Sequence, residues 1–439
     1  MTALHTDLYE IRMAASYLRR GMTEPAVFSL FARRLPRHRG FLVAAGLAEA
    51  LDFLAGFAFD HEELAYLRQV VGLPQSDVDE LAGMRFTGEA WAVPEGTVVH
   101  ADEPLLEITA PLPQAQLIET AMLNFLTFGT TVASKAVRCR LAAGGADLVD
   151  FAARRTQGTD AAFTVARLTA LAGFSGTSHV ASALRYGLRP VGTMAHSYVQ
   201  AFGDERSAFE AFAEDFPVAP VFLVDTYDTI AGVEQAIEVA RRAGLPAERV
   251  GIRLDSGDLL ELSRRARVLL DEAGLTGARI MASGSLDEYA LAELTAAGAP
   301  IDSYGVGTKV GVSADAPYLD SAYKLVEYAG RPVMKLSPGK ATLPGAKQVY
   351  RGADGDVLAL RDEEPPPGHR PLLEPVLRAG RRVPGRHTPA DARERLEHDL
   401  AALPPGARRL REPDRTQVRL SAALTGLAAR TRLAHPVRH

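Results

Sequence analysis

The chain has 439 residues, of which 47% are hydrophobic and 23% are charged, and its formal net charge is −5. This length is too great for one ordinary core and predicts two or three domains, while the composition excludes a disordered or fibrous protein. The nearly balanced charge excludes the broad positive surface with which proteins bind nucleic acids or anionic membranes, so we expect neither as a partner.

The first 112 residues mix helical and strand patterns. Residues 6–21 carry apolar side chains at helical spacing, with Thr6 as the expected cap and Gly21 as the expected end. In residues 26–36 and 91–109, apolar and polar side chains alternate and prolines and glycines interrupt the pattern, which is typical of strands and turns. We therefore predict an α+β domain over residues 1–112.

A long helical pattern follows from about residue 114 to residue 143. It predicts either one helix or two helices with a break at Gly129. The single cysteine of the chain, Cys139, lies in this pattern and cannot form an internal disulfide. A chain without internal disulfides is typical of a reducing compartment, and we expect the cytoplasm. No uninterrupted apolar run approaches the roughly 18 residues that a membrane span needs.

The middle of the chain contains β-rich runs at a regular distance from one another. They read VFLVDTYDT (221–229), VGIRLDSGD (250–258), RIMASGSLD (279–287) and IDSYGVGTK (301–309). Amphipathic helical segments separate the first three, which is the spacing of consecutive βα units with parallel strands. We predict an α/β domain over residues 113–350, and both a β/α barrel and an open doubly wound sheet fit this pattern.

Polar and glycine residues stand where each run ends. Because the carboxyl ends of parallel strands meet at one edge of a sheet, these residues are expected to share a site. Glycine turns let backbone N–H groups approach a phosphate, although such turns are also ordinary punctuation. The residues predicted to meet are Asp225, Arg253, Asp255, Ser283, Gly284, Gly305 and Gly307.

Charged side chains in these runs allow two interpretations. Arg253 and Asp255 are separated by one residue and so point to the same face of a strand. They form either a structural ion pair or a site for a ligand with an anionic group and hydroxyls. Asp225 and Asp228 suit ribose hydroxyls or a magnesium ion, and helix capping is the alternative.

Two further places hold candidate residues. Phe151 and Arg154 of DFAARR follow another predicted strand, and an aromatic face beside a guanidinium suits a flat, charged heteroaromatic ring. A core position for Phe151 is the alternative. His196 lies in VGTMAHSYVQ, and this local sequence alone favours a core histidine that is hydrogen-bonded to backbone.

The chain after residue 350 is rich in proline and arginine, which indicates a solvated face. A helix is predicted to begin where Thr388 can cap and Pro389 stands first. We assign residues 351–439 to a C-terminal segment that packs on the N-terminal domain.

Many ordered stretches resemble the nicotinate phosphoribosyltransferase family, which belongs to the type II phosphoribosyltransferases. The resemblance implies an α/β fold with an irregular TIM-like (β/α) barrel and a smaller α+β domain, and a homodimer with shared active sites. Family members join nicotinate to 5-phosphoribosyl 1-pyrophosphate (PRPP) in NAD biosynthesis, and they couple this reaction to ATP hydrolysis through a phosphohistidine. The stretches are TDLYE, LIETAMLN, ASKAVR, DFAARR, FSGTS, GTMAHS, VDTYDT, RLDSGDL, ASGSLDE, YGVGTK, SADAPYLDSAYKLVE and PGAKQV.

The resemblance also implies roles for single residues. His196 would accept phosphate from ATP. Tyr9 of the partner subunit would stack on the pyridine ring opposite Phe151. Arg154 and Arg253 would contact the substrate phosphate or the nicotinate carboxylate. Asp225 and Asp255 would bind the ribose hydroxyls and the Mg²⁺ that enters with PRPP and ATP. The phosphate of the ribose would lie in a cradle formed by Ser283, Gly284, Gly305, Gly307 and Thr308. The family uses no tightly bound organic cofactor.

The stretch FSGTS bears on the choice of substrate. Nicotinamide-using relatives carry an aspartate at the position of Ser178, next to Thr177, which we also expect to contact substrate. A serine hydroxyl can donate to a carboxylate, so Ser178 favours nicotinate over the amide. The chain departs from the family at Ala152, where glycine is usual, and at His179, where asparagine is usual. The alternatives are a non-catalytic nucleotide-binding sensor and a sister enzyme that uses nicotinamide or quinolinate.

Overall fold

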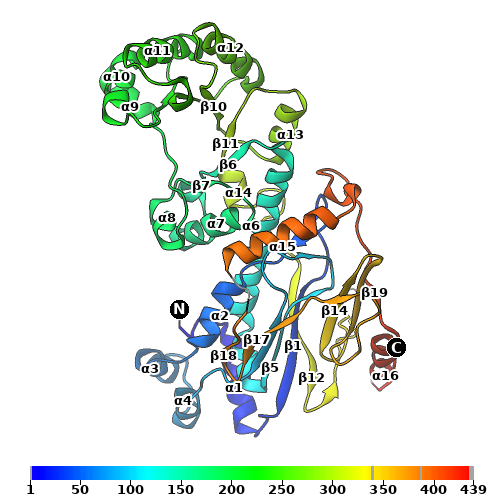
Figure 1. Cartoon of the computed structure of the whole chain (residues 1–439). Helices are drawn as coiled ribbons and strands as arrows, with labels where there is room; N and C mark the ends of the chain where they lie inside the picture. Colours follow the sequence, from blue (N-terminus) through cyan, green and yellow to red (C-terminus); the bar gives the residue numbers. More distant parts are fainter. Residues whose placement is uncertain (1, 338–340, 386–387, 435–439) are drawn as a thin grey trace. The chain divides into compact units, whose positions relative to one another are not determined.

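The computed structural model describes residues 2–337, 341–385 and 388–434 (Figure 1). The chain forms two compact units, the first from Met1–Ser134 and Tyr318–His439 and the second from Lys135–Pro317. These divisions differ from the boundaries expected at residues 112 and 350. The reason is long-range strand pairing, because β12 (Ser321–Tyr328) runs antiparallel to β1 (Pro25–Ala32).

The first unit is built on a seven-stranded antiparallel sheet that segments from both ends of its sequence share. Its core includes Phe28 of β1, which stacks on Tyr323 of β12 with ring centroids 4.7 Å apart. The sheet confirms the predicted strands at 26–36 and 91–109. In spatial order its strands are β13 (Arg331–Pro332), β12, β1, β5 (Pro104–Pro111), β3 (Glu89–Ala92), β17 (Glu374–Arg378) and β18 (Arg381–Arg382).

Two small sheets and several helices complete the first unit. The small sheets are β16 (Arg370–Pro371), β14 (Lys347–Gly352), β15 (Gly355–Leu360) and β19 (Arg419–Leu420), and β2 (Leu42–Val43) with β4 (Val98–Val99). The helices are α1 (Leu8–Arg19), α2 (Leu47–Ala55), α3 (His61–Gln69), α4 (Gln75–Ala82), α5 (Leu112–Leu117), α15 (Pro389–Ala402), η3 (Pro405–Arg408) and α16 (Ala422–Leu433).

One detail of the helices differs from the sequence predictions, one decides between two alternatives, and one agrees. Asp7, not Thr6, is the cap residue of α1, and the Thr6 hydroxyl donates to the Glu10 carboxylate instead. Of the two alternatives for the long helical pattern, the one without a break at Gly129 is found, because α6 (Glu119–Ala142) is continuous through it. A Cβ at Gly129 would lie 2.6 Å from the backbone nitrogen of Gly46, so this glycine permits a close approach of two backbones. Thr388 caps α15 as predicted.

The second unit is built on a six-stranded parallel sheet. Its spatial order is β7 (Gly176–Thr177), β6 (Asp147–Asp150), β11 (Ser303–Val306), β10 (Arg279–Ala282), β9 (Gly251–Leu254) and β8 (Val221–Leu223). The predicted α/β arrangement with parallel strands is confirmed. Closure into an irregular TIM-like barrel stays a prediction, because no strand ladder of the described residues joins β7 to β8.

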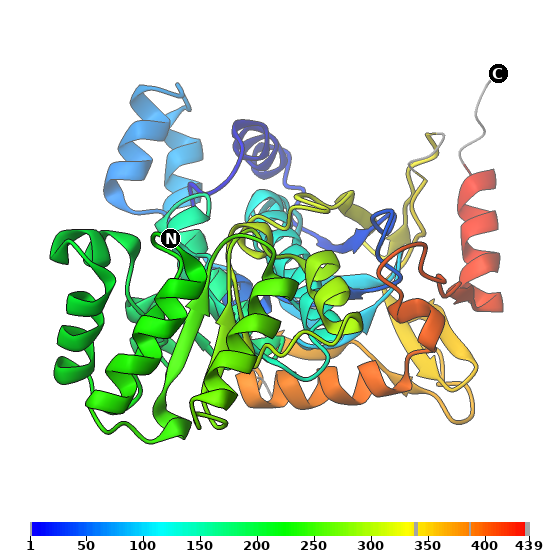
Figure 2. The same ribbon diagram turned by 90° about the horizontal axis from the view of Figure 1, so that it is seen from above.

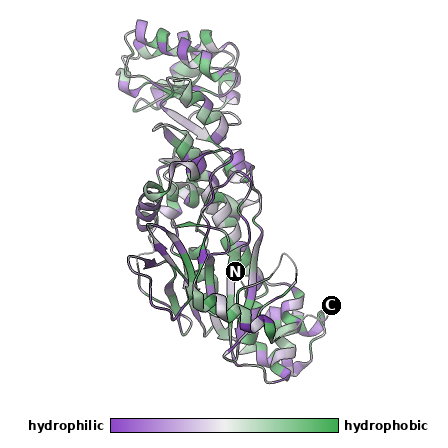
Figure 3. Cartoon of the chain, turned by 90° about the vertical axis from the view of Figure 1, so that its right-hand side faces the viewer, coloured by the Kyte–Doolittle hydropathy of each residue, from purple (hydrophilic) through white to green (hydrophobic). Residues whose placement is uncertain are grey.

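Helices flank the strands of the second unit, which is green in Figure 2. Helix α12 contacts β9 and β10, and α11 contacts β9. Helices of this unit carry both hydrophobic and hydrophilic residues (Figure 3), and the buried residues of α12 include Ser263, Ala266 and Leu270, as expected where one helix face packs on a sheet. The elements are η1 (Ala153–Arg155), α7 (Thr159–Leu171), α8 (Val180–Tyr186), α9 (His196–Phe202), α10 (Glu205–Asp215), α11 (Thr229–Arg242), η2 (Ala247–Arg249), α12 (Leu259–Glu272), α13 (Glu288–Ala296) and α14 (Thr308–Gly311). Within the described ranges of the chain, none of the helices combines the length and the apolar character needed to cross a membrane.

Candidate functional site

The side chain of Arg253 connects three segments at the carboxyl edge of the parallel sheet. Its Nε donates to Ser283 Oγ over 2.8 Å, its Nη1 to Thr193 Oγ1 over 3.0 Å, and its Nη2 to Asp255 Oδ1 over 2.7 Å. These partners follow β10, precede α9 and follow β9, respectively. A planar guanidinium can satisfy three acceptors in fixed directions, so Arg253 fixes the relative positions of all three segments.

Phe151 packs against Arg253. The guanidinium carbon lies 5.4 Å from the centroid of the Phe151 ring, within the range of a cation–π contact. The ring also lies on Gly305, where a Cβ atom would come within 2.7 Å of it. Glycine at 305 therefore makes room for the ring beside β11, and the ring is held at the same edge of the sheet as the Arg253 network.

Asp255 is an ionised member of this network. Burial raises the pKa of the Asp255 carboxyl, but hydrogen bonds from Ser283 and Arg253 and the charges of Arg253 and His196 lower it below its usual value. The turn after β10 must also be close to Asp255. Gly284 has a φ of +92°, and a Cβ there would lie 2.0 Å from the Asp255 carbonyl oxygen, so only glycine fits.

His196 is the first residue of α9 and faces two polar side chains. Its Nδ1 lies 3.2 Å from Thr226 Oγ1, and its Nε2 lies 3.8 Å from Asp255 Oδ2. The side chain is 40% exposed. These contacts overturn the expectation from the local sequence alone, since His196 is neither a core residue nor paired with backbone. It is placed where an incoming group can reach the ring.

Asp225 follows β8, and only one of its two carboxylate oxygens accepts hydrogen bonds from the described residues. Its Oδ2 accepts from Ser256 Oγ over 2.5 Å and from the Asp255 amide over 3.2 Å. Its Oδ1 is buried and has no hydrogen-bond partner among the described residues. Asp228 has a different role, because its carboxylate caps α11 by accepting from the Ala231 amide over 2.8 Å. Of the two carboxylates in VDTYDT, the geometry therefore makes Asp225 the candidate metal or hydroxyl ligand.

The described part of the chain holds no group of three or more histidine, cysteine, aspartate or glutamate side chains that could bind a metal alone. Mg²⁺ is commonly held by one or two carboxylates together with substrate phosphates. The unpartnered Asp225 Oδ1, with Asp255 adjacent in the same network, fits that mode of binding.

Other predicted residues lie outside the Arg253 network. The hydroxyl of Thr177, a buried residue, donates to Asp150 Oδ2 over 2.7 Å, and Ser178 is exposed at the end of β7. Arg154 is exposed in η1, and no hydrogen bond of the described residues joins it to Arg253. Tyr9 belongs to the first unit, on α1, and is 47% exposed. Gly307 and Thr308 form the turn that begins α14.

The two departures from the family pattern are accommodated locally. Ala152 has a φ of −83° and a ψ of −24°, which any residue adopts, so the backbone there does not require glycine. His179 precedes α8, and its Nδ1 lies 2.6 Å from Ser182 Oγ.

Some site residues were missed at the sequence level. Thr193, Thr226 and Ser256 bind Arg253, His196 and Asp225, and each lies within three residues of a predicted site residue in sequence, which was the available signal. Glu205 gave no such signal. It is buried, which raises the pKa of its carboxyl, while the nearby amides of Tyr227 and Thr226 lower it, so Glu205 lies against the loop after β8.

The parallel sheet defines an α/β protein, and the charged network lies at its carboxyl edge, where such folds commonly bind ligands. Family profiles match nearly all of this chain. They are the nicotinate phosphoribosyltransferase N-terminal domain over residues 4–127, the nicotinate phosphoribosyltransferase family over residues 146–342 and the corresponding C-terminal domain over residues 368–428. The chain belongs to the nicotinate phosphoribosyltransferase family.

Individual relatives cover most of the chain. The nicotinate phosphoribosyltransferase pncB2 of Mycobacterium tuberculosis is 47% identical over 98% of this chain and 94% of its own length. The nicotinate phosphoribosyltransferase of Bacillus subtilis is 45% identical over 82% of this chain and 77% of its own length. The crystal structure of human nicotinic acid phosphoribosyltransferase superimposes with a TM-score of 0.86 at 30% identity, over 97% of this chain and 99% of the human one. A nicotinate-nucleotide pyrophosphorylase structure from Pyrococcus furiosus has a TM-score of 0.76 at 25% identity, over 91% of this chain and 95% of its own.

Proposed function

We propose that this chain transfers the phosphoribosyl group of PRPP to nicotinate, giving nicotinate mononucleotide and pyrophosphate for NAD biosynthesis. The observation that carries the proposal is the Arg253 network, in which a guanidinium, an ionised carboxylate, a histidine and an aromatic ring meet. A flat aromatic acid and an anionic sugar need these groups side by side. Identity of 47% to a nicotinate phosphoribosyltransferase supports the same conclusion.

The reaction needs no side-chain nucleophile. The lone pair of the pyridine nitrogen forms the bond to the anomeric carbon of ribose, while the bond from that carbon to the pyrophosphate oxygen breaks and pyrophosphate leaves with its electron pair. Phe151 supplies a face on which the pyridine ring lies, and Arg253 stabilises negative charge beside it. Much of the rate therefore comes from holding the nitrogen and the anomeric carbon in line.

Mg²⁺ enters with PRPP and ATP in this proposal. Asp225 and Asp255 would hold the ion and the ribose hydroxyls, and the bound ion would neutralise the departing pyrophosphate. The buried Asp225 Oδ1, which has no hydrogen-bond partner among the described residues, supports this assignment. Ser283, Gly284, Gly305, Gly307 and Thr308 would form the cradle for the 5-phosphate. Arg154 would reach the substrate from η1.

His196 would accept phosphate from ATP, coupling hydrolysis to the transfer. Its exposed ring beside Asp255 supports this role, because a phosphoryl group there adds negative charge next to the proposed metal site. We expect ATP and Mg²⁺ alone to produce an acid-labile phosphate on His196, which peptide mass spectrometry would locate. A phosphate on another residue, or none, would contradict this role. The His179→Gln variant should be phosphorylated like the wild type, because His179 is bonded to Ser182 and not to the network.

Ser178 would select nicotinate over nicotinamide. It is exposed at the end of β7, two positions after Gly176, where its hydroxyl can donate to a carboxylate. We expect Ser178→Asp to lower kcat/KM for nicotinate by about a hundredfold, since it replaces a donor with a negative charge. Turnover of the acid and of the amide would be compared in both proteins. An unchanged preference would remove Ser178 from the specificity site, and Ser175→Asp is a control at a residue that precedes the same strand.

The remaining parts of the proposal concern assembly. We infer a homodimer in which Tyr9 of the partner subunit stacks on the pyridine ring, and we place the protein in the cytoplasm. The parallel sheet would close into an irregular TIM-like barrel. A cavity of about 380 Å³ lined by both Val221 of β8 and Val191, which follows the bridge between Thr177 of β7 and Pro190, supports that closure.

The test separates this function from a nucleotide-binding sensor on the same fold. Purified protein is given nicotinate, PRPP, Mg²⁺ and ATP, and the nucleotide product is identified by mass. The proposal predicts nicotinate mononucleotide. Binding of PRPP without any product would favour the sensor, and a product formed only from nicotinamide or quinolinate would favour a sister enzyme.

A further inference from the structure

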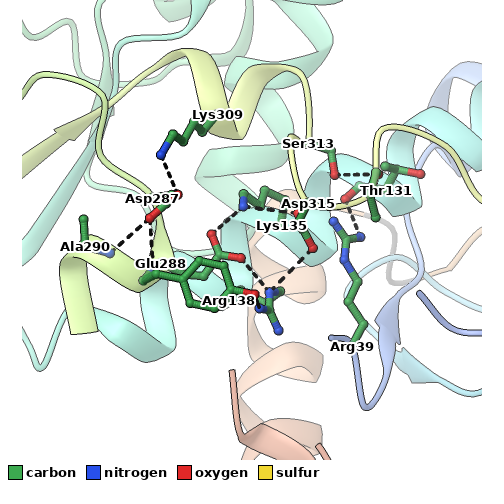
Figure 4. A network of polar contacts seen from close by, with 12 residues as sticks. Arg39, Thr131, Lys135, Arg138, Asp287, Glu288, Ala290, Lys309, Ser313 and Asp315 are labelled. Carbon is green, nitrogen blue, oxygen red and sulfur yellow. Dashed lines mark hydrogen bonds and ion pairs between the residues drawn. The ribbon is translucent and has the colours of Figure 1, made fainter. Parts of the chain in front are cut away.

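The two acidic residues at the start of α13 are bound to cations from other elements of the second unit (Figure 4). Asp287 caps α13 with Oδ1, which accepts from the amides of Tyr289 and Ala290 over 3.1 and 3.0 Å. Its Oδ2 accepts from Lys309 Nζ over 2.7 Å. The next residue, Glu288, is fully buried. One acidic side chain therefore serves both as a helix cap and as the partner of a lysine on another segment.

The Asp287–Lys309 pair joins the two glycine turns at the edge of the parallel sheet. Asp287 stands three residues after Gly284, and Lys309 stands two residues after Gly307. Burial raises the pKa of Asp287, but the hydrogen bond and charge of Lys309 and the Ala290 amide lower it below its usual value. The Asp287 carboxylate is therefore ionised at neutral pH, and it faces Lys309 Nζ from the other turn.

A buried network provides the rigid base for this pair. Glu288 accepts from Lys135 Nζ and, over 2.9 Å, from Arg138 Nε. Lys135 also lies 3.1 Å from Asp315, which follows α14. Figure 4 shows these side chains together with the Asp287–Lys309 pair. Removing a partner from such a buried network would destabilise the fold. The Asp287–Lys309 pair is more exposed, so the effect of its loss on ligand binding can be measured in a folded protein.

We propose that Asp287 and Lys309 are positioning residues, which hold the two glycine turns at the separation needed to bind the 5-phosphate of PRPP. This inference rests on the proposed function. An ion pair whose lysine is 40% exposed contributes little to the stability of the fold. The same pair has a larger effect on PRPP binding, because backbone N–H groups of both turns can donate to the phosphate only when both turns are correctly placed.

Asp287→Asn separates the two roles of this side chain. Asparagine keeps the cap, since its carbonyl oxygen can accept from the α13 amides, but it loses the charge that binds Lys309. We expect the KM and the Kd for PRPP to rise about tenfold while kcat changes by less than about twofold and the melting temperature is retained. The double variant Asp287→Asn with Lys309→Gln can form a neutral hydrogen bond in place of the ion pair and should recover most of the affinity.

The outcomes are distinguishable. A PRPP Kd of Asp287→Asn equal to that of the wild type would overturn the positioning role. A loss of PRPP affinity that the double variant does not restore would also overturn it, because it would point to direct contact between Lys309 and phosphate. A large fall in melting temperature would also overturn it. Asp271→Asn is the matched control, since Asp271 pairs with Arg267 on α12 over 2.8 Å, away from both turns. Calorimetric PRPP binding tests the pair, whereas the absence of nucleotide product from the wild type would contradict the proposed function instead.

Discussion

Replacing Asp225 with asparagine is expected to lower turnover by about a hundredfold and to raise the Mg²⁺ concentration needed for half-maximal activity. The asparagine side chain would still accept from Ser256 and the Asp255 amide, so the loop after β8 keeps its hydrogen bonds. The buried Oδ1, which has no partner among the described residues, would become an amide nitrogen that cannot bind a cation. Activity would be measured as a function of Mg²⁺ at saturating PRPP.

Asp228→Asn is the control for this prediction, because it makes the same chemical change three residues along the same loop. Asp228 caps α11, and asparagine caps helices about as well as aspartate. Its variant should keep the Mg²⁺ dependence of the wild type. If both variants respond alike, or if Asp225→Asn retains full activity at low Mg²⁺, then Asp225 does not bind the metal.

Replacing Arg253 with lysine is expected to lower kcat/KM for PRPP by about a thousandfold although the positive charge remains. Lysine is a point charge and cannot reproduce the fork that binds Ser283, Thr193 and Asp255 together. It also removes the guanidinium whose central carbon lies 5.4 Å from the centroid of the Phe151 ring. Steady-state kinetics with nicotinate and PRPP, together with thermal melting, would measure the effect.

Arg279→Lys provides the matched control on the neighbouring strand. Arg279 begins β10, at the edge of the sheet opposite to the site, and it is 60% exposed. We expect its variant to stay within about twofold of the wild type. A mild effect of Arg253→Lys, similar to that of Arg279→Lys, would show that charge alone is needed at position 253 and that the three hydrogen bonds are not.

The sequence alone was sufficient for the parts of the site that depend on strand periodicity. Parallel strands share a carboxyl edge, and residues two apart on a strand point to one face, so Arg253 and Asp255 were expected side by side with Ser283 nearby. The structure places them in direct contact. The regular spacing of the βα runs likewise predicted the parallel order of β8, β9 and β10, which is confirmed.

Features that depend on three-dimensional context could not be predicted. A carboxylate that caps a helix and one with an oxygen free for a ligand look alike in sequence, and only the three-dimensional structure separates Asp228 from Asp225. Gly129 has the pattern of a helix break but serves a close backbone approach. Burial of Glu288 follows from partners far away in the chain, Lys135 and Arg138. No local pattern contains that information.

The division into two units also depends on contacts between residues that are far apart in the sequence, so local patterns could not predict it. Local patterns placed a boundary near residue 350, but β12 pairs along its length with β1, nearly 300 residues earlier in the sequence. Such pairing depends on the fit of two distant strands and on the core they share, not on the composition around the boundary.

The most direct measurement follows nicotinate mononucleotide and pyrophosphate together in one reaction of the wild-type protein with nicotinate, PRPP, Mg²⁺ and ATP. The account predicts that the two products appear in equal amounts, that neither appears without nicotinate, and that Arg253→Lys suppresses both alike. Pyrophosphate released without nucleotide, or no product under conditions in which PRPP is bound, would contradict it.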